Sequence, residues 1–138
     1  MTKLSYLEAI HQAMHQAMEK DDDVFVLGED VGKKGGVFGV TLGLQERFGI
    51  ERVIDTPLAE SNIVGTAIGA AMMGKRPVAE IQFAEYILPA SNQIISEAAK
   101  MRYRSNNGWQ APLTIRSPFG GGIHLSLIHI SEPTRPER

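Results

Sequence analysis

Short apolar runs alternate with helical patterns along most of this chain, and that alternation limits the folds open to it. Behind the capping-box pair Ser5 and Glu8, apolar residues recur at helical spacing and predict a helix over residues 6–19. Similar patterns predict strands over 24–27, 52–55, 78–83 and 113–116, and helices over 42–48, 60–74 and 90–104. Because strands that alternate with helices pair in parallel, we expect an α/β fold, a mostly parallel sheet with helices on both faces.

Length and composition exclude several classes of protein. The 138 residues suffice for one domain, and the formal net charge of −2 argues against a nucleic-acid partner. With no cysteine, the chain has no disulfide, thiolate zinc site or cysteine nucleophile. Its longest uncharged apolar stretch, Ile63 to Gly74, is too short to span a membrane, and no targeting segment is visible. We therefore expect a cytoplasmic protein with no membrane partner.

Polar clusters follow three of the predicted strands, where ligands bind in open α/β sheets. They comprise residues 28–30, 55–60 and 82–86. Glu60 has two interpretations: a first-turn carboxylate that complements the helix dipole, or a group that faces a ligand. Its spacing alone leaves both open.

Other polar features favour ordinary surface roles. His11 and His15 are four residues apart, but a glutamine stands where a metalloprotease has its general base, and no third ligand is evident. The glycines at 120–122 could bind an anion through backbone amides, although no P-loop lysine or serine follows them. The basic groups at 33–34 and 102–104 are most simply interpreted as solvated surface.

Five motifs occur together in order and carry a resemblance. They are Val-Leu-Gly-Glu-Asp-Val-Gly (26–32), Gly-Gly-Val-Phe (35–38), Asp-Thr-Pro-Leu-Ala-Glu (55–60), Ala-Glu-Ile-Gln-Phe-Ala-Glu-Tyr (79–86) and Leu-Thr-Ile-Arg-Ser-Pro-Phe-Gly-Gly-Gly (113–122). From residue 3 to about residue 124, the chain resembles the β subunit of the thiamine-diphosphate-dependent 2-oxo acid dehydrogenases, the E1 component. The resemblance implies a transketolase-like pyrimidine-binding domain over residues 1–124.

The same resemblance implies a set of site residues. Glu60 would hydrogen-bond N1′ of the cofactor's aminopyrimidine ring, the contact that activates the thiazolium carbon. Tyr86 would pack on that ring, with Gln82 as a neighbouring polar contact and Leu58 as a backbone contact. Glu29 resembles a buried acidic residue close to the cofactor.

Cofactors and partners are also implied by the resemblance. An α subunit would hold the magnesium ion and the diphosphate in an α2β2 heterotetramer, which would pass the acyl group to a lipoyl-bearing E2. Ala111, Leu113 and Thr114 fall where branched-chain members bind a structural potassium ion.

The motif around Tyr86 favours a branched-chain 2-oxo acid as substrate, with pyruvate as the alternative. A non-catalytic α/β binding protein is a rival from another class. A transketolase-type enzyme with both halves on one chain is disfavoured, because no Gly-Asp-Gly magnesium motif is present and the match begins near residue 1.

Residues 125–138 depart from the family. They resemble translated sequencing-adapter DNA, so we expect an artefactual tail, and His129 does not match the histidine that serves the lipoyl arm. The pyrimidine-binding domain would then be truncated. We expect the chain expressed alone to aggregate, because an open sheet edge is exposed, and to be inactive.

Overall fold

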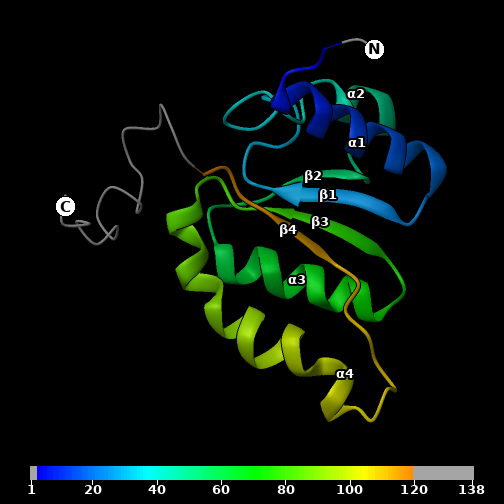
Figure 1. Ribbon diagram of the computed structural model, residues 1–138, viewed down its shortest axis with the longest axis vertical. Helices are drawn as coiled ribbons and strands as arrows, with labels where there is room; N and C mark the ends of the chain where they lie inside the picture. The colour runs from blue at the N-terminus through cyan, green and yellow to red at the C-terminus, as the bar shows by residue number, and fades with distance from the viewer. Residues whose placement is uncertain (1–2, 120–138) are drawn as a thin grey trace, which may run out of the picture.

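A parallel four-stranded sheet forms the centre of the computed structural model, which describes residues 3–119 (Figure 1). The strands are β1 (Val24–Gly28), β2 (Val53–Asp55), β3 (Arg76–Glu80) and β4 (Thr114–Arg116). Their order is β2-β1-β3-β4, and every neighbouring pair is parallel. All the carboxyl ends therefore meet at one edge, as the sequence predicts.

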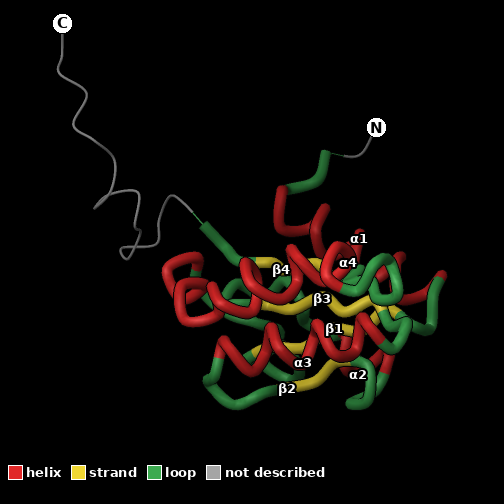
Figure 2. The backbone as a smooth tube through the Cα atoms, turned by 90° about the horizontal axis from the view of Figure 1, so that it is seen from below, coloured by secondary structure: helices red, strands yellow, loops and turns green. Residues whose placement is uncertain are grey.

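Helices cover both faces of the sheet, which confirms the predicted layers. Helices α1 (Tyr6–Lys20) and α2 (Leu44–Phe48) lie on one face, and α3 (Glu60–Met72) lies on the other with the helical segment that ends in α4 (Met101–Arg104) (Figures 1 and 2). Each face has its own apolar core. One core contains Met18, Val26 and Leu44, and the other contains Leu27, Val64 and Ile81.

The first helix begins where its cap places it. Ser5 Oγ accepts the Glu8 amide at 3.2 Å, and the Glu8 carboxylate accepts the Ser5 amide at 2.7 Å. These two bonds satisfy amides that have no partner inside the helix. The predicted span of 6–19 is thus confirmed to within one residue.

The third strand differs from its predicted span of 78–83. It starts at Arg76 and ends at Glu80, because neither neighbouring strand extends beyond that register. Pro77 is tolerated inside it. The Arg76 amide donates to Asp23 O in the segment leading into β1, and the Ile81 amide donates to Arg116 O on β4. Amides alternate in direction along the strand, so the N–H that Pro77 lacks would point to the β4 side, before β4 begins.

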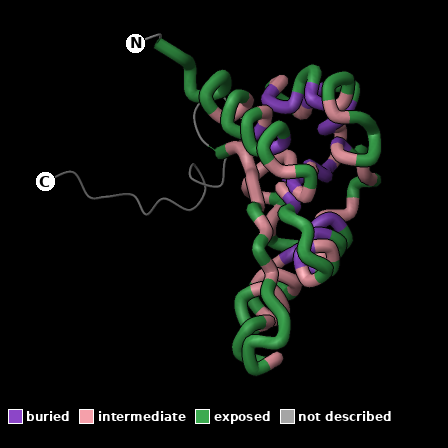
Figure 3. The backbone as a smooth tube through the Cα atoms, turned by 90° about the vertical axis from the view of Figure 1, so that its right-hand side faces the viewer, coloured by how far each residue is buried: buried purple, intermediate pink, exposed green. Residues whose placement is uncertain are grey.

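Residues 91–104 are helical throughout, close to the predicted span of 90–104, but they do not form one regular α-helix. The chain forms 3-10 turns from Ala84 to Ala90 (η1), a π-helical stretch from Gln93 to Glu97, further 3-10 turns to Lys100, and only then α4. Pro89 lies inside η1, and its backbone nitrogen has no hydrogen to donate to a helical hydrogen bond. Figure 3 shows buried residues gathered around the sheet, while the end of this helical segment is largely exposed.

Two expectations lie outside the described residues: the glycines at 120–122 and the tail at 125–138, with His129. Within residues 3–119, no helix is both long and apolar enough to cross a bilayer.

Candidate functional site

Loops from three strands meet at the carboxyl edge of the sheet. Gly28 at the end of β1 is in register with both Asp55 and Glu80, the last residues of β2 and β3. The Thr56 amide donates to Gly28 O at 2.9 Å, so the loop after β2 is held directly against the end of β1. The three predicted polar clusters therefore share one edge.

Glu29 and Glu60 are close enough to influence one another. Glu29 directly follows β1, and Glu60 is the first residue of α3; both are half-buried. Burial raises the pKa of Glu29, and the negative charges of Asp30 and Glu60 raise this pKa further, against the opposing charge of Lys34. The fold thus brings a loop carboxyl group and a helix carboxyl group into one electrostatic environment.

The position of Glu60 is set by the helix that it begins. Ala59 is the N-cap, and its side chain cannot cap the helix. Because Glu60 is the first residue of the helix, its carboxylate lies in the first turn, where the helix dipole favours negative charge. The next residue, Ser61, donates its hydroxyl to Pro89 O in η1 at 3.0 Å. This bond ties the start of α3 to the segment that carries Tyr86.

Asp55 joins the loops after β1 and β2. Its carboxylate accepts the Gly32 amide at 2.7 Å. A side chain at position 32 would collide with the ends of the Asp55 and Gln45 side chains, so it would displace both from their hydrogen bonds. Beside this contact, the Thr56 hydroxyl is buried without a hydrogen-bond partner.

Three aromatic rings form a cluster that the sequence analysis missed in part. Phe83 packs edge-on against Phe38 at 6.2 Å between ring centroids and against Tyr86 at 5.7 Å. Phe38 comes from the loop after β1, whereas Phe83 and Tyr86 follow β3. Tyr86 stays 42% exposed. The sequence does contain Phe38 within the Gly-Gly-Val-Phe motif, but it does not indicate which residues this ring contacts in the folded protein.

The other predicted contacts also lie on this side of the sheet. Gln82 is half-buried, two residues beyond the end of β3. Leu58 lies between β2 and α3 and is 67% exposed. An exposed apolar side chain in a short strand-to-helix loop is available to contact a ligand or another subunit.

Ala111, Leu113 and Thr114 do not join this cluster. Thr114 begins β4 in register with Val78 in the middle of β3, Ala111 and Leu113 precede it, and the Leu113 amide donates to Ala111 O at 2.9 Å. The potassium site stays a prediction.

The histidine pair is half-buried and makes contacts within the fold, rather than lying on an exposed helix face. His11 Nδ1 lies 2.7 Å from Val40 O, and His15 packs edge-on against Phe48. Among residues 3–119, no group of three or more histidine, aspartate or glutamate side chains is arranged to hold a metal ion.

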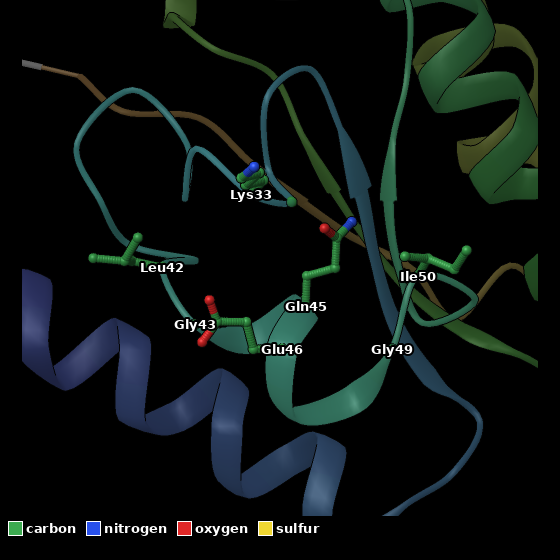
Figure 4. Close-up of a pocket in the computed structure, with 8 residues that line it drawn as sticks. Lys33, Leu42, Gly43, Gln45, Glu46, Gly49 and Ile50 are labelled. Carbon is green, nitrogen blue, oxygen red and sulfur yellow. The ribbon is translucent and has the colours of Figure 1, made fainter.

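A cavity of about 300 Å³ lies between α2 and the loop after β1 (Figure 4). Gln45 rises from α2 toward the strands and donates to Val53 O at 2.8 Å. The cavity is lined by Gly32, Lys33, Leu42, Gly43, Gln45, Glu46, Gly49 and Ile50. None of the predicted site residues belongs to this lining.

Glu80 was not selected from the sequence, although it is the most deeply buried carboxylate among the described residues. It is 2% exposed and forms an ion pair with Arg116, its direct neighbour across the β3–β4 ladder. The sequence feature that could have pointed to a buried carboxylate is a glutamate that stands between the apolar residues Ala79 and Ile81.

Comparison with known proteins gives consistent matches. A family model described as the transketolase pyrimidine-binding domain matches residues 2–126. The chain is 64% identical over 129 residues to the 2-oxoisovalerate dehydrogenase subunit beta of Bacillus subtilis, covering 94% of this chain and 39% of that protein.

Two further relatives represent both substrate types. One is the 2-oxoisovalerate dehydrogenase subunit beta of Pseudomonas aeruginosa, 50% identical over 96% of this chain and 38% of the relative. The other is the pyruvate dehydrogenase E1 component subunit beta of Acholeplasma laidlawii, 52% identical over 96% of this chain and 40% of the relative. The chain thus spans about two fifths of the length of these proteins.

Proposed function

The chain belongs to the transketolase pyrimidine-binding domain family, and from this premise we propose that it forms part of the β subunit of a thiamine-diphosphate-dependent 2-oxo acid dehydrogenase. Its substrate in the complete enzyme would be a branched-chain 2-oxo acid. The observation that carries the proposal is the convergence of Glu60, Glu29 and the aromatic cluster at the carboxyl edge of the sheet.

The residues at this edge fit the aminopyrimidine half of the cofactor. Glu60 supplies a carboxylate able to share a proton with a ring nitrogen. Tyr86, at 42% exposure, keeps a ring available to pack on a planar heterocycle. The buried, unpartnered Thr56 hydroxyl adds a polar group beside the same loops. When bound, thiamine diphosphate supplies the electron sink that decarboxylation of a 2-oxo acid requires.

The chain's own groups would bind the ring and manage its proton. We assign to Glu60 the hydrogen bond to the ring nitrogen, and to Leu58 and Gln82 the neighbouring backbone and polar contacts. Glu29, with its raised pKa, can hold a proton closer to neutral pH than an ordinary glutamate does. We assign Glu29 only the place of an acidic neighbour of Glu60 near the cofactor.

The remaining partners belong to the same proposal. An α subunit would supply the magnesium and diphosphate half of the site in an α2β2 heterotetramer, and a lipoyl-bearing E2 would receive the acyl group. Pyruvate is the second candidate substrate, because the relatives include pyruvate enzymes at similar identity. Rates on 2-oxoisovalerate and pyruvate, measured side by side on one preparation, decide between them.

The decisive experiment replaces Glu60 by glutamine in a full-length β subunit that contains this segment, assembled with its α subunit. Loss of the carboxylate should lower the rate of decarboxylation by about a hundredfold or more. The matched control is Glu51→Gln, the same change at an exposed carboxylate before β2. Undiminished decarboxylation in Glu60→Gln would refute the role of Glu60. Failure of the wild-type complex to bind thiamine diphosphate would favour a non-catalytic binding protein.

A further inference from the structure

The glycine-rich loop, residues 29–43, folds back over a buried charge. Its turns are held by backbone bonds from the Gly36 amide to Asp30 O at 2.8 Å and from the Thr41 amide to Gly35 O at 3.0 Å. The carboxylate of Glu80 lies beneath it. A Cβ built on Gly36 would be 2.9 Å from Glu80 Oε1 and 3.4 Å from Thr41 Oγ1.

The two carboxylate oxygens of Glu80 face different partners. Oε2 accepts a hydrogen bond from Arg116 Nη1, whose side chain is 16% exposed. Oε1 lies against Gly36, and the Thr41 hydroxyl, which is buried without a hydrogen-bond partner, lies against the same glycine. The Glu80 carboxylate therefore lies between Arg116 on β4 and the glycine-rich loop.

Burying the Glu80–Arg116 ion pair costs desolvation free energy, so the stability of the fold does not by itself explain why this pair is present. Burial raises the pKa of Glu80, and the charge and hydrogen bond of Arg116 only oppose that effect. Buried ion pairs commonly stabilise a fold no better than apolar residues of equal size. What a charged pair adds is a fixed geometry for the groups around it.

The loop that Glu80 contacts carries Phe38 into the aromatic cluster. Phe38 lies between Gly36, beside the carboxylate, and Thr41, and it packs on Phe83, which packs on Tyr86. We propose that Glu80 is a positioning residue: paired with Arg116, it fixes the glycine-rich loop and thereby the aromatic cluster at the carboxyl edge of the sheet, where Glu60 also lies. The link from loop to ligand rests on the proposed function, whereas the link from Glu80 to the loop does not.

Hydrogen exchange tests the first link without any cofactor. In the full-length β subunit with its α partner and no thiamine diphosphate, Glu80→Gln should speed amide exchange in residues 30–43 about tenfold. Exchange in α3 should stay unchanged. The control is Asp23→Asn, which removes an exposed ion pair with Lys75 at the opposite end of the sheet and should leave the loop unaffected. Unchanged loop exchange, or an equal rise in every segment, would overturn the proposal.

A double variant separates positioning from the cost of an unpaired charge. Glu80→Gln with Arg116→Met removes both charges, so it should fold even where the single variant does not. Fast exchange confined to residues 30–43 is again expected. A return of these residues to wild-type exchange would overturn the proposal, because an unpaired Arg116 would then explain the single variant.

Binding of thiamine diphosphate to the same complexes tests the second link. Loosening the loop should raise the dissociation constant for thiamine diphosphate about tenfold, which corresponds to about 1.4 kcal/mol of weaker binding. An unchanged constant in a variant with a loosened loop would overturn the link from loop to site. If the wild-type complex does not bind thiamine diphosphate, the proposed function fails, and hydrogen exchange still decides the role of Glu80.

Discussion

The Asp55 carboxylate accepts the Gly32 amide at 2.7 Å and thereby fastens the loop after β1 to the end of β2. This contact depends on the absence of a side chain at position 32, where a methyl group would collide with Asp55 and Gln45. The loop that it anchors contributes Glu29 and Phe38 to the candidate site.

We expect Gly32→Ala to destabilise the fold by about 1–3 kcal/mol, because the added methyl group overpacks this contact. Urea unfolding of a full-length β subunit with and without the substitution measures the change. Gly69→Ala is a matched control inside α3, where a Cβ meets nothing within 4 Å. It should stabilise the chain by about 0.5–1 kcal/mol, since alanine favours the helix. Equal effects at the two positions would contradict the account of Gly32.

Arg52 and Arg47 both lie over the Phe48 ring but differ in their partners. The Arg52 guanidinium donates to the carbonyl oxygens of Met18, Asp21 and Val24 near the end of α1. Arg52→Met should therefore cost about 2–3 kcal/mol of unfolding free energy. Arg47→Met removes an exposed pair with Glu19 and should cost at most about 1 kcal/mol. Thermal unfolding of the two variants would show the ranking, and a reversed order would reject it.

The raised pKa of Glu29 predicts how its replacement alters stability with pH. Folding favours the protonated group, so its contribution is fully present below the ordinary value of 4.5. This contribution is lost as the pH rises through the raised pKa. Glu29→Gln, which resembles the protonated form, should match wild type at low pH and become the more stable protein toward neutral pH. Urea unfolding across this range tests it, and a parallel pair of pH profiles would contradict the raised pKa.

Tyr86 is proposed to contribute its ring rather than its hydroxyl to the cofactor site. Tyr86→Phe should then keep the dissociation constant for thiamine diphosphate within about twofold of the wild-type value. Tyr86→Ala should raise this constant about tenfold. Calorimetry on the α/β complex measures both. Equal losses in the two variants would assign the contact to the hydroxyl group instead.

Local patterns in the sequence determined the layers of this protein. The capping box at Ser5 and Glu8, the strand at β1 and the small-residue helix α3 are all found close to their predicted positions. These features are readable because helix periodicity, caps and apolar runs arise from near neighbours along the chain. The polar clusters at the strand ends followed from parallel pairing, and they do share one edge.

Tertiary structure decided what depends on partners distant in sequence. The third strand ends at Glu80 because its neighbours end there, and the helical segment after it is broken by 3-10 and π-helical turns. Phe38 meets Phe83, and Glu80 meets Arg116, only once register and loop path are fixed. A one-dimensional pattern records which residues prefer burial, but the free energy of a buried charge or ring depends on the group that folding places beside it.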